Sequence, residues 1–197
     1  MKIIQNRKIS TKDTVLAGLF TALIAVGAFI RVPLPAIPFT MQIFFVCLAA
    51  MIMGRKSAWP AFIYMVLGLI GLPIFAKGGG IWYVFQPSFG YIPGFILGAY
   101  LGGYIVDKSR KNSYKKYLAG GFAAIAAAYA CGMIYYKLLN GLYLGNPVTA
   151  NILWAYLFIP FIPGDAVSAL LAAYIARKTV PALGKLWIST PDKQKTY

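Results

Sequence analysis

Long apolar stretches alternate along this chain with short connectors that hold most of its charged residues. Of the 197 residues, 60% are hydrophobic and only 12% are charged, whereas a soluble domain is about half apolar and about one quarter charged. The pattern predicts an all-α integral membrane protein of one domain over residues 1–197, with six transmembrane helices within 14–176 and tails at 1–13 and 177–197. The six stretches cover residues 14–30, 40–53, 58–72, 91–106, 117–139 and 152–176.

The positive charges predict how these helices face the membrane. There are 19 Lys and Arg residues against four acids, and the cations gather in the two tails and in the connectors at 54–57 and 107–116. With six crossings these segments share one side, and an excess of Lys and Arg marks the cytoplasmic side. We therefore expect both termini to be cytoplasmic and the lipid bilayer to be a partner. No basic patch interleaved with aromatic residues in a polar context indicates nucleic acid.

The first connector on the predicted outer side, "RVPLPAIPFTMQ", is stiff, extended and apolar. The second, third and fourth apolar stretches fall short of the roughly 20 residues that a straight crossing needs. We therefore expect such connectors to enter the membrane and this one to cover a cavity, although a plain turn between helices is the alternative. The expected lid residues are Pro33, Leu34, Pro35, Pro38 and Thr40.

The second outer connector, "GLPIFAKGGGIWYVFQPSFGY", contains three consecutive glycines followed by several aromatic residues. Glycines allow the backbone to approach a ligand closely, and Lys77 is one of few outer cations. The aromatic residues equally suit an interfacial belt. Neither this connector nor the rest of the sequence contains a phosphate-binding G-x-x-x-x-G-K-[ST] motif, so any ATP hydrolysis must come from another chain.

Asp165 is an acid inside the last apolar stretch, directly after Pro160, Pro163 and Gly164. A charged residue at the centre of a membrane costs about 2.5–3.5 kcal/mol and by default indicates function. Asp165 lies about 16 Å from the cytoplasmic end of its stretch at 1.5 Å per residue, near the middle of the membrane. We expect it to be a ligand acceptor in a cavity open to the outside. The alternative is a structural ion pair with Lys137 or Lys77.

Histidine is absent and the two cysteines lie in apolar stretches, so we predict no catalytic residue, no metal site and no cofactor. An intramembrane enzyme that uses Asp165 with Ser168 is the second class considered, but an acid and a serine alone lack an evident base. An ion or proton channel is the third class, and it has too few membrane charges for a relay. The chain is therefore not expected to be an enzyme.

Four motifs, "PLPAIPFTMQ", "GLPIFAKGGG", "PSFGYIPGF" and "FIPGD", resemble those of the BioY family in order and spacing. BioY proteins are the biotin-specific S-components of energy-coupling-factor (ECF) transporters, and the resemblance covers the chain from the first helix to the sixth. It implies that biotin binds in an outward-facing cavity closed by the first loop, in the cell membrane of a prokaryote. The implied partners are a transmembrane coupling protein and two ATPase subunits. An S-component for another vitamin, such as thiamin or riboflavin, is the nearest alternative.

The resemblance also implies a binding site. A cyclic urea presents two N–H donors that suit the carboxylate of Asp165, the sulfur ring suits Trp82 or its aromatic neighbours, and the ligand carboxylate suits Lys77 or Arg31. Relatives often have a lysine one turn after the P-G-D acid, whereas this chain has Ser168, which leaves open what balances Asp165. The expected substrate-binding residues are Gln42, Lys77, Gly78, Gly79, Trp82, Tyr91, Asp165 and Ser168.

The first apolar stretch carries small residues at helical spacing, among them Gly18, Ala22 and Ala25. Such faces allow helices to approach closely in lipid. The resemblance implies that this face docks on the coupling protein, and packing within the chain is the alternative.

Overall fold

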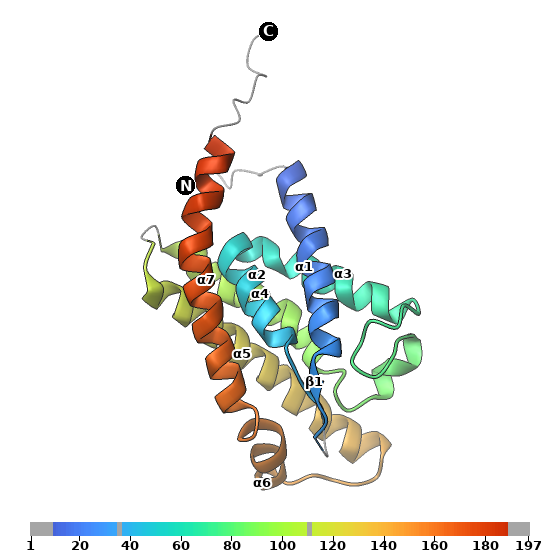
Figure 1. The fold of residues 1–197 in the computed structure, drawn as a ribbon. Helices are drawn as coiled ribbons and strands as arrows, with labels where there is room; N and C mark the ends of the chain where they lie inside the picture. The colour runs from blue at the N-terminus through green and yellow to red at the C-terminus, as the bar shows by residue number, and fades with distance from the viewer. Residues whose placement is uncertain (1–9, 35–36, 110–111, 189–197) are drawn as a thin grey trace, which may run out of the picture.

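The protein is described here by a computed structural model that covers residues 10–34, 37–109 and 112–188, with the backbone alone from 184 onward. This described part is mostly helical (Figure 1). Its α-helices are α1 (Thr11–Phe29), α2 (Gln42–Met53), α3 (Ala58–Leu69), α4 (Tyr91–Lys108), α5 (Tyr114–Leu138), α6 (Ala150–Leu153) and α7 (Ile162–Ile188). Its shorter elements are the strands β1 (Arg31–Val32) and β2 (Phe39–Thr40), the 3-10 helices η1 (Gly54–Ser57) and η2 (Ile81–Phe85), and the π-helices η3 (Leu139–Tyr143) and η4 (Trp154–Phe158).

Four helical stretches are long and apolar enough to cross a membrane: Thr11–Phe29, Gln42–Leu69, Tyr114–Tyr143 and Ile162–Leu183. The second of them joins α2, η1 and α3, and Gly54 interrupts it with a φ of +61°, a backbone conformation that favours glycine. The α2 and α3 helices have 12 residues each, or about 18 Å, less than the hydrocarbon thickness of about 30 Å. The predicted count of six crossings therefore stays a prediction.

The last apolar stretch, predicted as one crossing over residues 152–176, is broken where Pro160 and Pro163 lie. The α6 helix and η4 end before a turn at 159–161, and α7 starts afresh at Ile162 and runs on to Ile188, into the predicted C-terminal tail. Pro160 cannot donate a backbone hydrogen bond, and Pro163 is tolerated because the first turn of a helix needs no donor. Asp165 therefore lies in the first turn of α7 and not in the middle of a long helix.

Small residues allow the helices to pack closely. A Cβ atom at Gly98 of α4 would lie 2.5 Å from the carbonyl oxygen of Ala124 on α5, so this pair of helices needs glycine there to approach at backbone distance. The α7 helix buries Ala169, Ala172, Ala173 and Ala176. It packs on α2 and α5, and α2 also contacts α1 (Figure 1).

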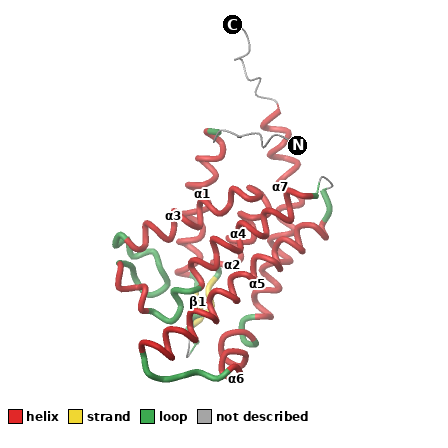
Figure 2. The backbone as a smooth tube through the Cα atoms, turned by 180° about the vertical axis from the view of Figure 1, so that it is seen from behind, coloured by secondary structure: helices red, strands yellow, loops and turns green. Residues whose placement is uncertain are grey.

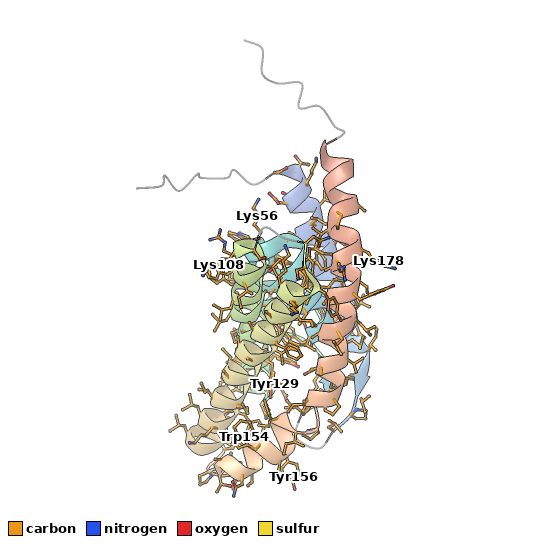
Figure 3. The ribbon with its side chains drawn as sticks, turned by 90° about the vertical axis from the view of Figure 1, so that its left-hand side faces the viewer. Lys56, Lys108, Tyr129, Trp154, Tyr156 and Lys178 are labelled. Carbon is orange, nitrogen blue, oxygen red and sulfur yellow. The ribbon has the colours of Figure 1, made fainter. Side chains whose placement is uncertain are left out.

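The two ends of the molecule differ. The start of α1, η1, the end of α4 and the end of α7 gather at one end, and the β1–β2 hairpin and α6 lie toward the other (Figures 1 and 2). Lys56 and Lys108 lie near the first end, and Trp154 and Tyr156 near the second (Figure 3). The cation-bearing connectors thus share one end, as the predicted orientation requires, while the side of the membrane that this end faces stays a prediction.

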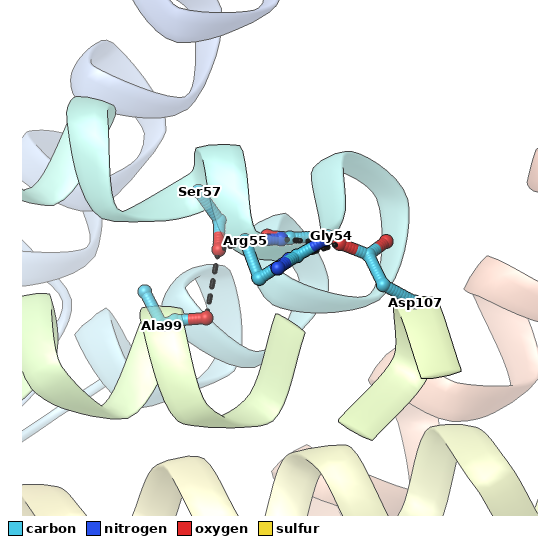
Figure 4. Close-up of polar contacts among 5 residues, drawn as sticks. All are labelled: Gly54, Arg55, Ser57, Ala99 and Asp107. Carbon is cyan, nitrogen blue, oxygen red and sulfur yellow. Dashed lines mark hydrogen bonds and ion pairs between the residues drawn. The ribbon is translucent and has the colours of Figure 1, made fainter. Parts of the chain in front are cut away.

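Ion pairs tie the cation-rich end together. Arg55 of η1 pairs with Asp107 of α4, with its Nε atom 3.3 Å from Oδ2, and its backbone N–H donates to the same oxygen at 3.1 Å (Figure 4). Ser57 donates to the carbonyl oxygens of Gly54 and Ala99. The Nζ atom of Lys56 lies 2.5 Å from Oδ2 of Asp13.

Candidate ligand-binding cavity

A cavity of about 620 Å³, measured with the part open to solvent, lies among the β1–β2 hairpin, α2, the α3–α4 connector, α4, α5 and the start of α7. A concave, largely apolar wall with a few convergent polar groups is typical of a small-molecule site. Among the described residues of its wall, Asp165 is the single charged side chain. The other polar wall residues are Thr40, Gln42, Tyr64, Tyr83, Ser88, Tyr91 and Tyr129. Much of the remaining wall is apolar, including Ile37, Phe39, Ile43, Phe95, Ile125 and Phe161.

Asp165 is brought into the cavity by the start of α7. The residue is 5% exposed, and the hydroxyl of Tyr129 on α5 donates a hydrogen bond to its Oδ2 atom. The ion pairs within the described residues do not include Asp165. The considered pairing with Lys137 or Lys77 is therefore not formed in the described part, and the acid remains available to a ligand.

Gln42 begins α2 and lies in a chain of hydrogen bonds that links the hairpin to α3. Thr40 of β2 donates to its Oε1 atom at 3.2 Å, and its Nε2 atom donates to the Tyr64 hydroxyl at 2.8 Å. That hydroxyl donates in turn to the carbonyl oxygen of Ile74 at 3.1 Å. These bonds orient the amide and leave one N–H and one oxygen lone pair for a ligand.

The glycine connector contributes to the cavity through residues other than those expected. Gly78 has a φ of +117°, and a Cβ atom at Gly79 would lie 2.1 Å from the carbonyl oxygen of Leu72, so these glycines form a tight turn. Neither lines the cavity wall, to which this connector contributes Ala76, Tyr83 and Ser88 instead. Their role in this structure is to shape the loop.

Trp82 lies outside the cavity, 78% exposed and stacked on Phe85, with the ring centroids 5.9 Å apart. Tyr83, the next residue of η2, is buried and lines the wall, with its hydroxyl 3.4 Å from Oγ of Ser88. Burial raises the pKa of the Tyr83 hydroxyl above that of a free tyrosine.

The other expected site residues fall into two groups. Tyr91 lines the wall and its hydroxyl donates to the carbonyl oxygen of Leu157 at 3.3 Å. Ser168 is buried on α7 but does not line the cavity. Lys77 lines a separate outer hollow together with Arg31, Pro33, Leu34 and Pro38.

The first connector forms a two-stranded antiparallel hairpin, so the all-α prediction needs this small correction. Arg31 pairs with Thr40, and Val32 with Phe39. Pro38 and Thr40 line the cavity and Pro33 and Leu34 the outer hollow, whereas Pro35 falls outside the described residues.

The ring of Phe39 sits between the hairpin and the start of α7. Its centroid lies 6.0 Å from that of Phe161, and a Cβ atom at Gly164 would come within 2.5 Å of its Cζ atom. The hairpin thus packs against the residue that precedes Asp165.

Sequence reasoning missed Tyr64, Ser88 and Tyr129 in the cavity wall. Tyr129 had a recognisable signal, because it is a polar-tipped side chain within the alanine-rich segment "AAIAAAYACG" of α5. In Figure 3 it lies in the middle of the molecule, between the labelled residues of the two ends.

The small residues of α1 face in different directions. Gly18 and Ala22 are exposed, and no atom comes within 4 Å of a Cβ atom placed on Gly18. Ala25 is half-buried and packs against the core. Within the described residues, no group of three or more His, Cys, Asp or Glu side chains is placed to hold a metal ion.

Comparison with known proteins identifies the family. The family model described as "BioY family" matches residues 4–185. The chain belongs to the BioY family. This confirms the resemblance noted from its four motifs.

Relatives with BioY names cover most of the chain. "Biotin transporter BioY" of Thermotoga maritima is 41% identical over 167 residues, which are 84% of this chain and 94% of that protein. "Probable biotin transporter BioY" of Lysinibacillus sphaericus is 36% identical over 170 residues, 86% of this chain and 87% of that protein. This BioY chain therefore aligns with its relatives along nearly their full length.

A solved structure has the same fold. It is the crystal structure of the S-component for biotin from an ECF-type ABC transporter, with a TM-score of 0.73 at 23% sequence identity, covering 90% of this chain and 94% of that one. The BioY chain thus shares its helical arrangement.

Proposed function

We propose that this BioY protein is the substrate-binding S-component of an ATP-driven ECF importer and that its ligand is biotin. The observation that carries the proposal is the distribution of charge around the cavity: one buried acid in a wall of neutral polar and apolar groups, with Arg31 and Lys77 in the hollow outside it. Biotin has the complementary order, with a cyclic urea, an apolar sulfur ring and a terminal carboxylate. The names of the relatives agree with this ligand.

The cyclic urea is placed at Asp165. Its N–H groups donate to the carboxylate, and such charge-assisted hydrogen bonds are stronger than neutral ones. The amide of Gln42 supplies a donor for the urea carbonyl. The sulfur ring packs on the aromatic wall near Tyr83 and Tyr91, and the carboxylate tail points outward to Arg31 and Lys77.

The first connector acts as the lid in this proposal. The packing of Phe39 against Phe161 and Gly164 supports it, because the hairpin then covers the cavity beside Asp165. Entry of the ligand requires this contact to open. Lys77, Gly78 and Gly79 shape the outer rim and do not form the floor.

The rest of the transporter is supplied by other chains. A transmembrane coupling protein docks on α1 through the face that carries Gly18, Ala22 and Ala25, and two ATPase subunits provide the energy. The exposure of Gly18 and Ala22 supports this face more strongly than the half-buried Ala25 does. The proposal places six helices in the cell membrane of a prokaryote, with both termini in the cytoplasm.

The chain is a transport protein and not an enzyme, in agreement with its named relatives. An intramembrane enzyme that uses Ser168 gains no support, because this residue does not line the cavity with Asp165.

Binding titration tests the proposed ligand. The purified full-length chain in detergent is titrated calorimetrically with biotin, thiamin and riboflavin. We expect tight binding of biotin alone. Tight binding of thiamin or riboflavin without biotin would assign the chain to another vitamin.

A further inference from the structure

Among the residues that the structure describes, no cation pairs with Asp165. The cations closest in sequence to the site motifs, Arg31 and Lys77, line the outer hollow and not the cavity wall. Ser168, one turn further along α7, provides no charge. A buried carboxylate without compensation is unfavourable, so another group must stabilise and orient it.

We propose that Tyr129 is the positioning residue for Asp165, and that its hydroxyl, together with the N-terminal turn of α7, takes the place of a cation. This inference rests on the proposed function of the cavity. Asp165 lies in the first turn of α7, where the partial positive charge of a helix N-terminus favours an anion. The Tyr129 hydroxyl adds a direct hydrogen bond to Oδ2.

The ring of Tyr129 is fixed from two sides. It is buried, and it packs edge-on against Phe158 of η4 at 5.2 Å between centroids and against Tyr91 of α4 at 6.2 Å. Because the ring cannot turn away, its hydroxyl has a defined direction. Tyr129 thereby fixes the position of the carboxylate from a neighbouring helix.

A single neutral donor has a consequence for the ligand. An ionised carboxylate has about four lone-pair sites on two oxygens, and Tyr129 occupies one of them on Oδ2. The negative charge and the Oδ1 atom remain for the two N–H donors of a cyclic urea. A lysine ammonium at this place would bring three donors and neutralise the charge.

The competing explanation is a purely structural tie between α5 and α7. The structure contains such a tie elsewhere: the hydroxyl of Tyr114 on α5 donates to the carbonyl oxygen of Leu170 on α7 at 3.1 Å. Tyr114 does not line the cavity. The two tyrosines join the same pair of helices, so Tyr114→Phe is the matched control.

A double-mutant cycle separates the two roles. Biotin dissociation constants and melting temperatures are measured for the full-length wild type, Tyr129→Phe, Asp165→Ala and the combined variant. Removing a hydrogen bond to a charged group weakens binding about tenfold, and we expect this loss from Tyr129→Phe in the wild-type background only. Tyr114→Phe is expected to leave the affinity unchanged.

Two results would overturn the assignment: wild-type affinity in Tyr129→Phe, or the same fold loss with and without Asp165→Ala. If the wild type does not bind biotin, the proposed function fails, and the melting temperatures still decide the coupling. Tyr129→Phe should then lower the melting temperature less in the Asp165→Ala background. An equal decrease in both backgrounds would show that Tyr129 does not act through Asp165 and would overturn the assignment.

Discussion

Asp107 at the cation-rich end and Asp165 in the cavity wall are the same residue type, and they are held in opposite ways. The side chain of Asp107 is 41% exposed, and its Oδ2 atom accepts hydrogen bonds from the guanidinium and the backbone N–H of Arg55. Asp165 is 5% exposed and receives a neutral hydroxyl from Tyr129. Asp107 is paired with Arg55 and joins α4 to η1, whereas Asp165 keeps its charge and free lone pairs for a ligand.

The largest expected effect separates these two acids. Asp165→Asn replaces a charged acceptor by a neutral one, and we expect biotin affinity to fall about 10- to 100-fold in a calorimetric titration. Asp107→Asn should leave the affinity unchanged and lower stability by at most about 1 kcal/mol, because its ion pair is exposed. Equal affinity in the wild type and Asp165→Asn would remove the acid from the site.

A smaller loss of biotin affinity is expected from a substitution at Gly164, which packs against Phe39 of the proposed lid. Gly164→Ala places a methyl group against the ring of Phe39, and we expect biotin to bind about fivefold more weakly because overpacking here costs about 1 kcal/mol. The loss should appear as faster dissociation in a stopped-flow experiment.

Gly98→Ala is the matched glycine substitution in the α4–α5 contact, where the neighbour is backbone and cannot move aside. It should lower the melting temperature without a specific change in dissociation rate. Unchanged dissociation in Gly164→Ala would show that Phe39 does not hold the lid.

The outer cation is expected to matter less than the buried acid. Lys77→Met removes an exposed charge from the hollow that it shares with Arg31, and exposed pairs contribute about 0.2–1 kcal/mol. Biotin affinity should fall at most about fivefold, and the loss should shrink at high salt because ions screen exposed charges. A salt-independent loss would contradict this role.

Substitutions on the exposed face of α1 are expected to have no effect on biotin binding. Gly18→Leu combined with Ala22→Leu should leave biotin affinity unchanged, since both residues are exposed and outside the cavity wall. Copurification with the coupling protein should fall because bulky side chains prevent close helix approach. Normal complex formation would show that this face of α1 does not dock on the coupling protein.

Local chemistry made part of this protein predictable. The apolar stretches and the charged connectors indicated a helical membrane protein, and Asp165 was identifiable because an acid in such a stretch is expensive. Gly18 and Ala22 followed from spacing along one helix. These signals all lie within a single element.

The remaining features depend on contacts between elements. Tyr129 and Asp165 are 36 positions apart, and no local pattern states that α5 and α7 meet there. The sequence favoured Trp82, but the structure buries Tyr83 and exposes Trp82. The packing of Tyr83 on Phe75 decides this rotation of η2, and a local pattern does not show that contact. The break before α7 was visible in the prolines, but its effect on the depth of Asp165 was not.

The pairing of Arg31 with Thr40 gives the lid a further property. Thr40 donates a hydrogen bond to Gln42. In the proposed binding mode, Gln42 lies at the inner end of the ligand and Arg31 at its outer, carboxylate end. The Arg31–Thr40 pair of the hairpin therefore links the residues proposed for the urea end and the carboxylate end of the ligand. A hairpin this short is barely stable alone, so in the proposed binding mode a ligand that reaches both ends stabilises the closed lid, and closure depends on the length of the ligand.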